Sequence, residues 1–306
     1  MKAAAALYTL ASAAVLTLMV MRPPVEVSMP TAAKAPPAAV FAPPPANTAT
    51  PTATPTPPSP AKPAPDDNAK PDYEREQRMA DEIKGSIAGG EITTLNDGNH
   101  DFMGIFTPAE QPRGAVIVLH GCGNHPDWAD VTHPLRVGLA EKGWATLSLQ
   151  MPALDNNAKY FDYVPLFANA DKRIDAGIAF LKQKGIAPIV LAAHSCGAHM
   201  AMDWIDNKGD GEIVAYIGLG MGDTDTDQDL IKPFPLDKMK VPVLDVYGEK
   251  EYTQVINTAP ERLAMIQKAA NPQSKQMVLP EANHNFTDKG SELTAVVVNW
   301  LNSLPL

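Results

Sequence analysis

Short apolar runs alternate with amphipathic segments along the chain after about Tyr73. The apolar runs are rich in β-branched residues and predict buried strands; they span residues 115–119, 144–149, 189–193, 213–219, 241–247 and 277–279. Segments whose apolar residues recur at intervals of three and four predict helices; they span residues 134–142, 173–184, 197–205, 260–270 and 293–301. This alternation is typical of an α/β fold, a mainly parallel sheet with helices on both faces.

The first elements of this region have a different pattern. Residues 74–85 predict a short helix that Gly85 ends. Two runs of alternating polar and apolar residues, 92–95 and 101–107, flank the turn dipeptide Asp97-Gly98. We therefore expect a hairpin that forms an antiparallel edge of the sheet.

The amino-terminal end carries a targeting signal. After Lys2, residues 3–21 contain no charge, a length between that of a secretory signal and that of a membrane-spanning helix. Two interpretations of residues 1–21 stay open, a cleaved signal peptide or an uncleaved membrane anchor. Both place the rest of the chain across a membrane, so we expect a periplasmic or secreted protein, tethered to the inner membrane in the second case.

Residues 22–71 are rich in proline, alanine and threonine. Such a segment buries too little apolar surface to offset its ordering entropy, so we expect a disordered, extended linker. Residues 72–306 remain, enough for one domain with its own core. The formal net charge of −10 and the lack of a Lys/Arg cluster exclude a nucleic-acid-binding surface of the usual basic kind.

The stretch Ala193-His194-Ser195-Cys196-Gly197 joins a predicted strand to a predicted helix. That context is required of a nucleophile elbow, whose pattern is G-x-S-x-G, here with alanine at the first glycine. We expect Ala193 and Gly197, two positions before and two positions after the serine, to pack against each other. Ser195 fits the pattern better than Cys196. If Cys196 were the nucleophile, the bulky His194 would occupy the first position, which requires a small residue. A serine that only caps the following helix is the simpler interpretation.

Chain order favours the catalytic interpretation, because hydrolases with this elbow place nucleophile, acid and base in that order. His284 follows the last predicted strand and precedes the last helix, where the base is needed. Glu251 is the first candidate for the acid and Glu249 the second, both after the strand 241–247. Asp245 lies inside that strand, where its side chain would face a helix layer.

Four fragments carry a family resemblance: R-G-A-V-I-V-L-H-G-C-G, G-W-A-T-L-S-L-Q-M-P, P-V-L-D-V-Y-G-E-K-E-Y and A-N-H-N-F. The domain resembles the α/β-hydrolase superfamily, and closely a proteobacterial α/β-hydrolase-like family of unknown function. The resemblance implies an eight-stranded α/β-hydrolase fold and hydrolysis of an ester, thioester or amide. It also implies an acid three residues after the loop glycine, which is Glu251.

The oxyanion of acyl transfer needs two backbone N–H donors. The residue after the nucleophile, Cys196, supplies one, and the loop His120-Gly121-Cys122-Gly123 supplies the other, from Cys122 or Gly121. Two donors aimed at one oxygen lie close together, so Cys122 and Cys196, the only cysteines, are compatible with a disulfide. Two buried thiols that act as small apolar side chains are the alternative.

An aromatic segment lies between the strand that ends at Leu149 and the helix 173–184, and we expect it to cap the nucleophile. The candidate pocket residues are Tyr160, Phe161, Tyr163 and Phe167, with residues 124–128, from Asn124 to Trp128, on the opposite wall. They suggest an uncharged or apolar acyl group, although packing in the core explains them equally well. Two clusters could suggest a metal. The run Asp223, Asp225, Asp227 and Asp229 lacks the glycine and the terminal glutamate of a calcium loop, and His120, Cys122 and His125 already have a place in the oxyanion loop, so we expect no metal.

These patterns together predict an exported serine hydrolase. We expect a carboxylesterase that acts on a small-molecule ester through Ser195, His284 and Glu251, with no cofactor. The alternative is an envelope protein that uses the same fold for binding or scaffolding without catalysis.

Overall fold

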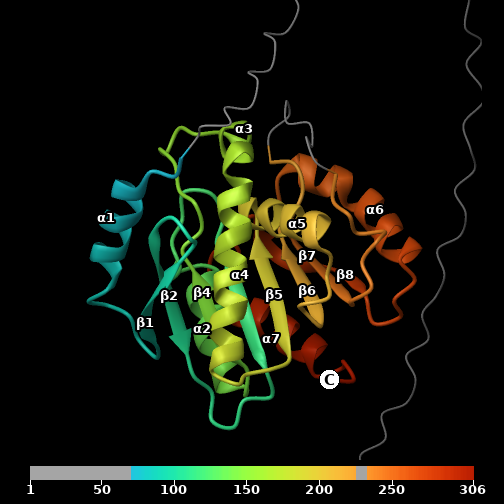
Figure 1. Ribbon diagram of the computed structural model, residues 1–306. Helices are drawn as coiled ribbons and strands as arrows, with labels where there is room; N and C mark the ends of the chain where they lie inside the picture. Colours follow the sequence, from blue (N-terminus) through green and yellow to red (C-terminus); the bar gives the residue numbers. More distant parts are fainter. Residues whose placement is uncertain (1–69, 225–232) are drawn as a thin grey trace, which may run out of the picture. The chain divides into compact units, whose positions relative to one another are not determined.

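The computed structural model describes residues 70–224 and 233–306 (Figure 1). The predictions for residues 1–21, for residues 22–69 of the linker, and for Asp225, Asp227 and Asp229 lie outside the described residues. Within the two described ranges, no helix is long and apolar enough to cross a membrane.

The described residues form an eight-stranded sheet in the order β1-β2-β4-β3-β5-β6-β7-β8. The β1–β2 hairpin is antiparallel, β2 is antiparallel to β4, and the remaining neighbours are parallel. The strands are β1 (Glu91–Asn96), β2 (Asp101–Thr107), β3 (Ala115–Leu119), β4 (Ala145–Leu149), β5 (Ile189–His194), β6 (Ala215–Leu219), β7 (Val243–Lys250) and β8 (Lys275–Asn283). The predicted α/β fold with an antiparallel edge hairpin is confirmed.

Helices cover both faces of the sheet (Figure 1). They are α1 (Tyr73–Ile83), α2 (Thr132–Glu141), α3 (Tyr160–Tyr163), the 3₁₀ turn η1 (Val164–Leu166), α4 (Phe167–Gln183), α5 (Cys196–Lys208), α6 (Thr253–Lys268) and α7 (Gly290–Leu301). One apolar cluster joins α4 and α5 to one face, with Ile117 and Leu191 from the strands. A second joins α2 and α7 to the opposite face, with Val116 and Val190. Successive strand residues point to opposite faces, which explains the continuously apolar runs.

Two helices begin earlier than the periodicity predicts. Helix α4 starts at Phe167 rather than at residue 173, and α6 starts at Thr253 although Pro260 lies inside it. Proline costs an isolated helix about 3 kcal/mol. Burial of Val255 and Ala259 on the amino-terminal side of the proline holds that part of α6 in place, so tertiary packing overrides local propensity.

Candidate active site

Ser195 occupies a sharp turn between β5 and α5. Its backbone has φ 52° and ψ −120°, a conformation that non-glycine residues rarely adopt and that persists only where surrounding structure enforces it. The N–H of Ser195 donates to the carbonyl oxygen of Leu219 at the end of β6, at 2.9 Å. The turn therefore lifts the hydroxyl above the carboxyl edge of the sheet, where parallel α/β proteins assemble their sites.

The requirement for glycine at position 197 has a different origin from the one that we inferred from the sequence. A β-carbon at Gly197 would meet the carbonyl oxygen of His120 at 2.5 Å and that of Leu119 at 3.1 Å. The nearest obstacle is thus the backbone at the end of β3, not the residue two positions before Ser195. Ala193 pairs in register with Leu119 inside the sheet, where its methyl group is accommodated.

His284 lies between Ser195 and a carboxylate. Its Nε2 is 2.8 Å from Ser195 Oγ, and its Nδ1 is 2.5 Å from Glu251 Oε1. A carboxylate only accepts hydrogen bonds, so Nδ1 carries the proton and Nε2 is left to accept the proton of the serine hydroxyl. The Glu251 side chain is fully buried and that of His284 nearly so, which protects the pair from water.

The other two carboxylates near β7 are turned away from His284. Glu249 accepts from the Glu281 N–H at 2.9 Å at the exposed end of β8. Asp245 is buried inside β7 and pairs with Arg262 of α6 at 2.9 Å, so it faces a helix layer as expected. Glu251 is thus the acid that the fold brings to His284.

Gly220 is a site residue that the sequence reasoning missed. It follows β6 with φ 54°, and a β-carbon there would stand 3.2 Å from both Glu251 Oε2 and His284 Nδ1. A side chain at this position would press on the hydrogen bond between the two residues. The signal was present as glycine directly after a buried strand, in Leu219-Gly220-Met221-Gly222.

His194 was also missed as a site residue. Its Nε2–H donates to the backbone carbonyl of His284 at 2.9 Å, which ties the His284 loop to the residue before Ser195. Burial, followed by repulsion from His284, lowers the pKa of His194 to about 3. His194 is therefore neutral at ordinary pH and adds no charge beside His284.

Cys122 and Cys196 form a disulfide with α-carbons 5.1 Å apart. The bond connects the loop after β3 to the first residue of α5. It excludes Cys196 as a free nucleophile and Cys122 as a thiolate metal ligand. Within the described ranges, no group of three or more His, Cys, Asp or Glu residues is arranged to hold a metal ion.

His120 holds the peptide between Gly121 and Cys122. Its Nε2 accepts from the Met151 N–H at 2.9 Å, so its proton resides on Nδ1, which donates to the Gly121 carbonyl at 2.8 Å. The Asn124 N–H binds the same carbonyl at 3.2 Å. In a trans peptide the following N–H points opposite to the carbonyl. The contacts that hold the Gly121 carbonyl therefore also fix the direction of the Cys122 N–H, the candidate oxyanion donor.

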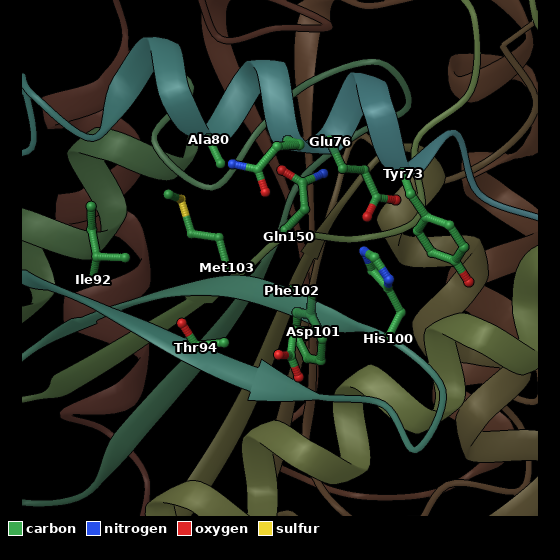
Figure 2. Close-up of a pocket in the computed structure, with 11 residues that line it drawn as sticks. Tyr73, Glu76, Ala80, Ile92, Thr94, His100, Asp101, Phe102, Met103 and Gln150 are labelled. Carbon is green, nitrogen blue, oxygen red and sulfur yellow. The ribbon is translucent and has the colours of Figure 1, made fainter.

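Gln150 supports His120 from behind. Its Nε2 lies 3.1 Å from His120 Nε2 and donates to the Met151 carbonyl at 2.8 Å. Figure 2 shows Gln150 at the back of a cavity of about 160 Å³ between α1 and the β1–β2 hairpin. Tyr73 of α1 stacks on His100 there, with ring centroids 3.8 Å apart. Ser195, Glu251 and His284 do not line this cavity, so it is separate from the candidate active site.

Two cavities meet at Ser195. One, of about 150 Å³, is lined by Cys122, Ala158, Lys159, Tyr160, Ser195, Cys196, His199 and Thr224. The other, of about 300 Å³, is lined by Gly121, Cys122, Asn124, His194, Ser195, Thr224, Tyr252, His284 and Asn285. Among these side chains, the sequence reasoning had selected Tyr160 and Asn124 for the pocket, and it had not assigned a pocket role to Tyr252, His199 or Asn285.

The other expected pocket residues do not line these two cavities. Tyr163 and Phe167 are buried in the apolar core under α4, and the Tyr163 hydroxyl accepts from the Leu154 N–H at 3.1 Å. Phe161 is partly buried against the same core. Trp128 packs edge-on against His125. The segment folds as α3 and η1 directly into α4, so that its start at Tyr160 lies beside Ser195 whereas Tyr163 and Phe167 pack in the core.

One family model matches most of the chain. The family described as "Protein of unknown function (DUF3530)" matches residues 27–165 and 166–303. The chain belongs to this family. A comparison with curated protein sequences found no match.

Solved structures place this family member among the α/β hydrolases by fold. Est1E from Butyrivibrio proteoclasticus is 17% identical with a TM-score of 0.54, over 70% of this chain and 98% of that one. An α/β serine hydrolase homologue from Coxiella burnetii is 16% identical with a TM-score of 0.52, over 71% and 99%. The esterase Pf2001 from Pyrococcus furiosus is 16% identical with a TM-score of 0.54, over 70% and 92%. At these identities the likeness establishes the fold, and the expected α/β-hydrolase resemblance is confirmed.

Proposed function

We propose that this protein is a serine carboxylesterase that uses Ser195, His284 and Glu251. The observation that carries the proposal is the continuous hydrogen-bonded path from Ser195 Oγ through His284 to Glu251, at 2.8 Å and 2.5 Å. A serine that merely capped α5 would need no such partners, and Ser195 makes no side-chain cap hydrogen bond.

The geometry supports acyl transfer in two steps. His284 Nε2 takes the hydroxyl proton as Ser195 Oγ attacks the ester carbonyl, and Glu251 stabilises the imidazolium that forms. The Cys196 and Cys122 N–H groups bind the oxyanion, with Gly121 as the loop residue that allows the close approach. His284 then protonates the leaving alcohol. In the second step His284 takes a proton from the water that attacks the acyl carbon, and it returns this proton to Ser195 Oγ as the carboxylic acid is released.

We also propose that the enzyme works outside the cytoplasm. The disulfide between Cys122 and Cys196 supports this location, because such bonds persist in oxidising compartments. The uncharged stretch at residues 3–21 would serve as signal peptide or inner-membrane tether, and residues 22–71 as the spacer. Mass spectrometry of the amino-terminal peptide distinguishes a cleaved signal peptide from an uncleaved anchor. The protein is recovered separately from the membrane fraction and from the soluble envelope fraction, and an uncleaved anchor predicts membrane-bound protein that retains residues 1–21.

Labelling with a fluorophosphonate probe tests the enzymatic proposal. We expect the wild-type protein to be labelled covalently at Ser195 and to hydrolyse p-nitrophenyl acetate. The Ser195→Ala variant should lose both properties while its melting temperature stays within a few degrees of the wild type. Well-folded wild-type protein that resists labelling would instead favour a binding or scaffolding role.

A further inference from the structure

The two cavities beside Ser195 differ in their relation to His284. Only the larger cavity includes His284 in its wall, and only the smaller includes Tyr160 and His199. In ester hydrolysis the general acid must reach the leaving oxygen, whereas the acyl group stays bonded to the serine. The larger cavity therefore receives the alcohol, and the smaller one receives the acyl group.

Two packed rings, those of Tyr160 and His199, form part of the wall of the acyl cavity. His199 lies 4.5 Å from the ring of Tyr160 and 4.9 Å from that of Phe234, measured between ring centroids. At about 150 Å³ the cavity holds roughly five groups of the size of a water molecule, given about 30 Å³ for each. An acetyl to butyryl group fits this space, and an octanoyl chain does not.

His199 adds no charge to the wall of the acyl cavity. His199 Nε2–H donates to the carbonyl oxygen of Gly222 at 3.2 Å. Burial lowers the pKa of His199 to about 4, so the ring is neutral at ordinary pH. Among the described residues that line this cavity, the one charged side chain is that of Lys159, which is exposed to solvent, so a carboxylate buried beside His199 would have no opposite charge from these residues. The cavity thus suits a short, uncharged acyl group.

The alcohol cavity is larger and polar. Asn124 and Asn285 contribute amides, each with donors and an acceptor. Tyr252 is 46% exposed and lies against His284, with ring centroids 4.4 Å apart. An exposed aromatic face beside two amides suits a molecule that has both C–H faces and hydroxyl groups.

We propose that the physiological substrate class is a short-acyl ester of a polyhydroxylated, carbohydrate-like alcohol, with Tyr160 and His199 limiting the acyl chain and Asn124, Tyr252 and Asn285 binding the alcohol. This proposal rests on the serine esterase function. It is narrower than the apolar ester that the aromatic segment suggests from the sequence, because Tyr163 and Phe167 are committed to the core. Water cleaves the acyl–oxygen bond, and the products are the free carboxylic acid and the free hydroxyl.

A chain-length series tests the acyl cavity. With p-nitrophenyl esters, kcat/KM should be highest between acetyl and butyryl and at least about 100-fold lower for octanoyl, since even two unaccommodated methylenes cost about tenfold each. The His199→Ala variant should raise the octanoyl-to-butyryl ratio at least about tenfold, because it removes a ring from the cavity wall. The control is His133→Ala, because the half-buried His133 lies on α2 and lines neither cavity, so this variant should leave the ratio unchanged.

A pair of acetyl esters tests the alcohol cavity. An acetylated monosaccharide should be hydrolysed with a kcat/KM at least about tenfold above that of ethyl acetate, because the hydroxyl groups gain partners that ethanol lacks. Tyr252→Ala and Asn285→Ala should lose this preference mainly through KM for the sugar ester, so that the ratio of kcat/KM for the sugar ester to that for ethyl acetate falls toward one.

The two proposals fail in different ways. Absence of fluorophosphonate labelling at Ser195 overturns the esterase function itself. Labelled, active protein that prefers octanoyl esters, or that does not distinguish acetylated sugar from ethyl acetate, leaves the esterase intact and overturns the substrate class.

Discussion

Glu251 Oε1 accepts a hydrogen bond from Nδ1 of His284, at 2.5 Å and across 33 residues of sequence. Two residues earlier on the same strand end, Glu249 binds the backbone of Glu281 instead. This difference assigns the two glutamates different roles, because only a carboxylate beside the imidazole can hold its tautomer and stabilise its charged form.

We predict that Glu251→Gln lowers kcat by about 10³-fold to 10⁴-fold, since a carboxamide can favour the wrong tautomer of His284. Steady-state hydrolysis of p-nitrophenyl acetate measures the effect. Glu249→Gln is the matched control, and its kcat should remain within about twofold of the wild type. Equal losses in the two variants would contradict the assignment.

A substitution at Gly197 should destabilise the fold as well as the site. A β-carbon there would stand 2.5 Å from the His120 carbonyl oxygen, so Gly197→Ala must shift the backbone of β3 or α5. We expect a loss of about 1–3 kcal/mol in the free energy of unfolding, as overpacking usually costs. Chemical denaturation measures it.

Gly211→Ala is the control for this experiment. A β-carbon at Gly211 meets no atom within 4 Å, so the variant should unfold at the wild-type denaturant concentration. A Gly197→Ala protein as stable as Gly211→Ala would show that the elbow tolerates a side chain.

Removal of the disulfide should weaken both stability and catalysis. Cys122 and Cys196 are 74 residues apart, and opening a loop of that length lowers the free energy of unfolding by about 4 kcal/mol. The Cys122→Ala/Cys196→Ala double variant keeps both backbone N–H groups, yet the loop after β3 loses its link to α5. We expect a lower melting temperature and a lower kcat with a smaller change in KM.

Wild-type protein treated with a dithiol reductant provides the comparison. It should behave like the double variant in calorimetry and in the esterase assay. If oxidised, reduced and doubly substituted proteins melt together, the bond contributes nothing to stability.

Stability should fall on acidification because several histidines are buried in the neutral form. Burial lowers the pKa of His120 and His194 to about 3 and that of His199 to about 4, from an ordinary value of 6.5. The unfolded chain therefore takes up these protons near pH 6.5 while the native protein does not. Their contribution is fully present above pH 6.5 and is lost as the pH falls toward 4.

His199→Phe isolates one of these protons and keeps a ring against Tyr160 and Phe234. Between pH 6 and pH 5, the free energy of unfolding of the variant should fall less steeply than that of the wild type. The two slopes should differ by at most about 1.4 kcal/mol per pH unit, the contribution of one proton. Asp171, whose pKa burial raises to about 6, acts in the opposite direction, but it is common to both proteins and cancels in the difference. Urea unfolding at each pH measures the slopes, and parallel slopes would contradict the prediction.

The sequence alone was sufficient for the α/β architecture and for placing Ser195 at a turn between a strand and a helix. Buried strands and amphipathic helices have local periodicities, and Ser195 lies at a strand-to-helix junction that a short pattern describes. Chain order also identified His284, because strand and helix signals on either side of it are local. Each of these features depends on residues within a few positions of one another.

Only the tertiary structure decided which residues from different strand ends contact one another. The choice between Glu251 and Glu249, the bond between Cys122 and Cys196, and the contact of His194 with the His284 carbonyl all join residues from different strand ends. The same holds for the aromatic segment, whose sequence suits a pocket and a core equally well; packing under α4 placed Tyr163 and Phe167 in the core. Local pattern determines the elements and their order, whereas the contacts between loops depend on how the whole sheet twists and packs, which no short window of sequence records.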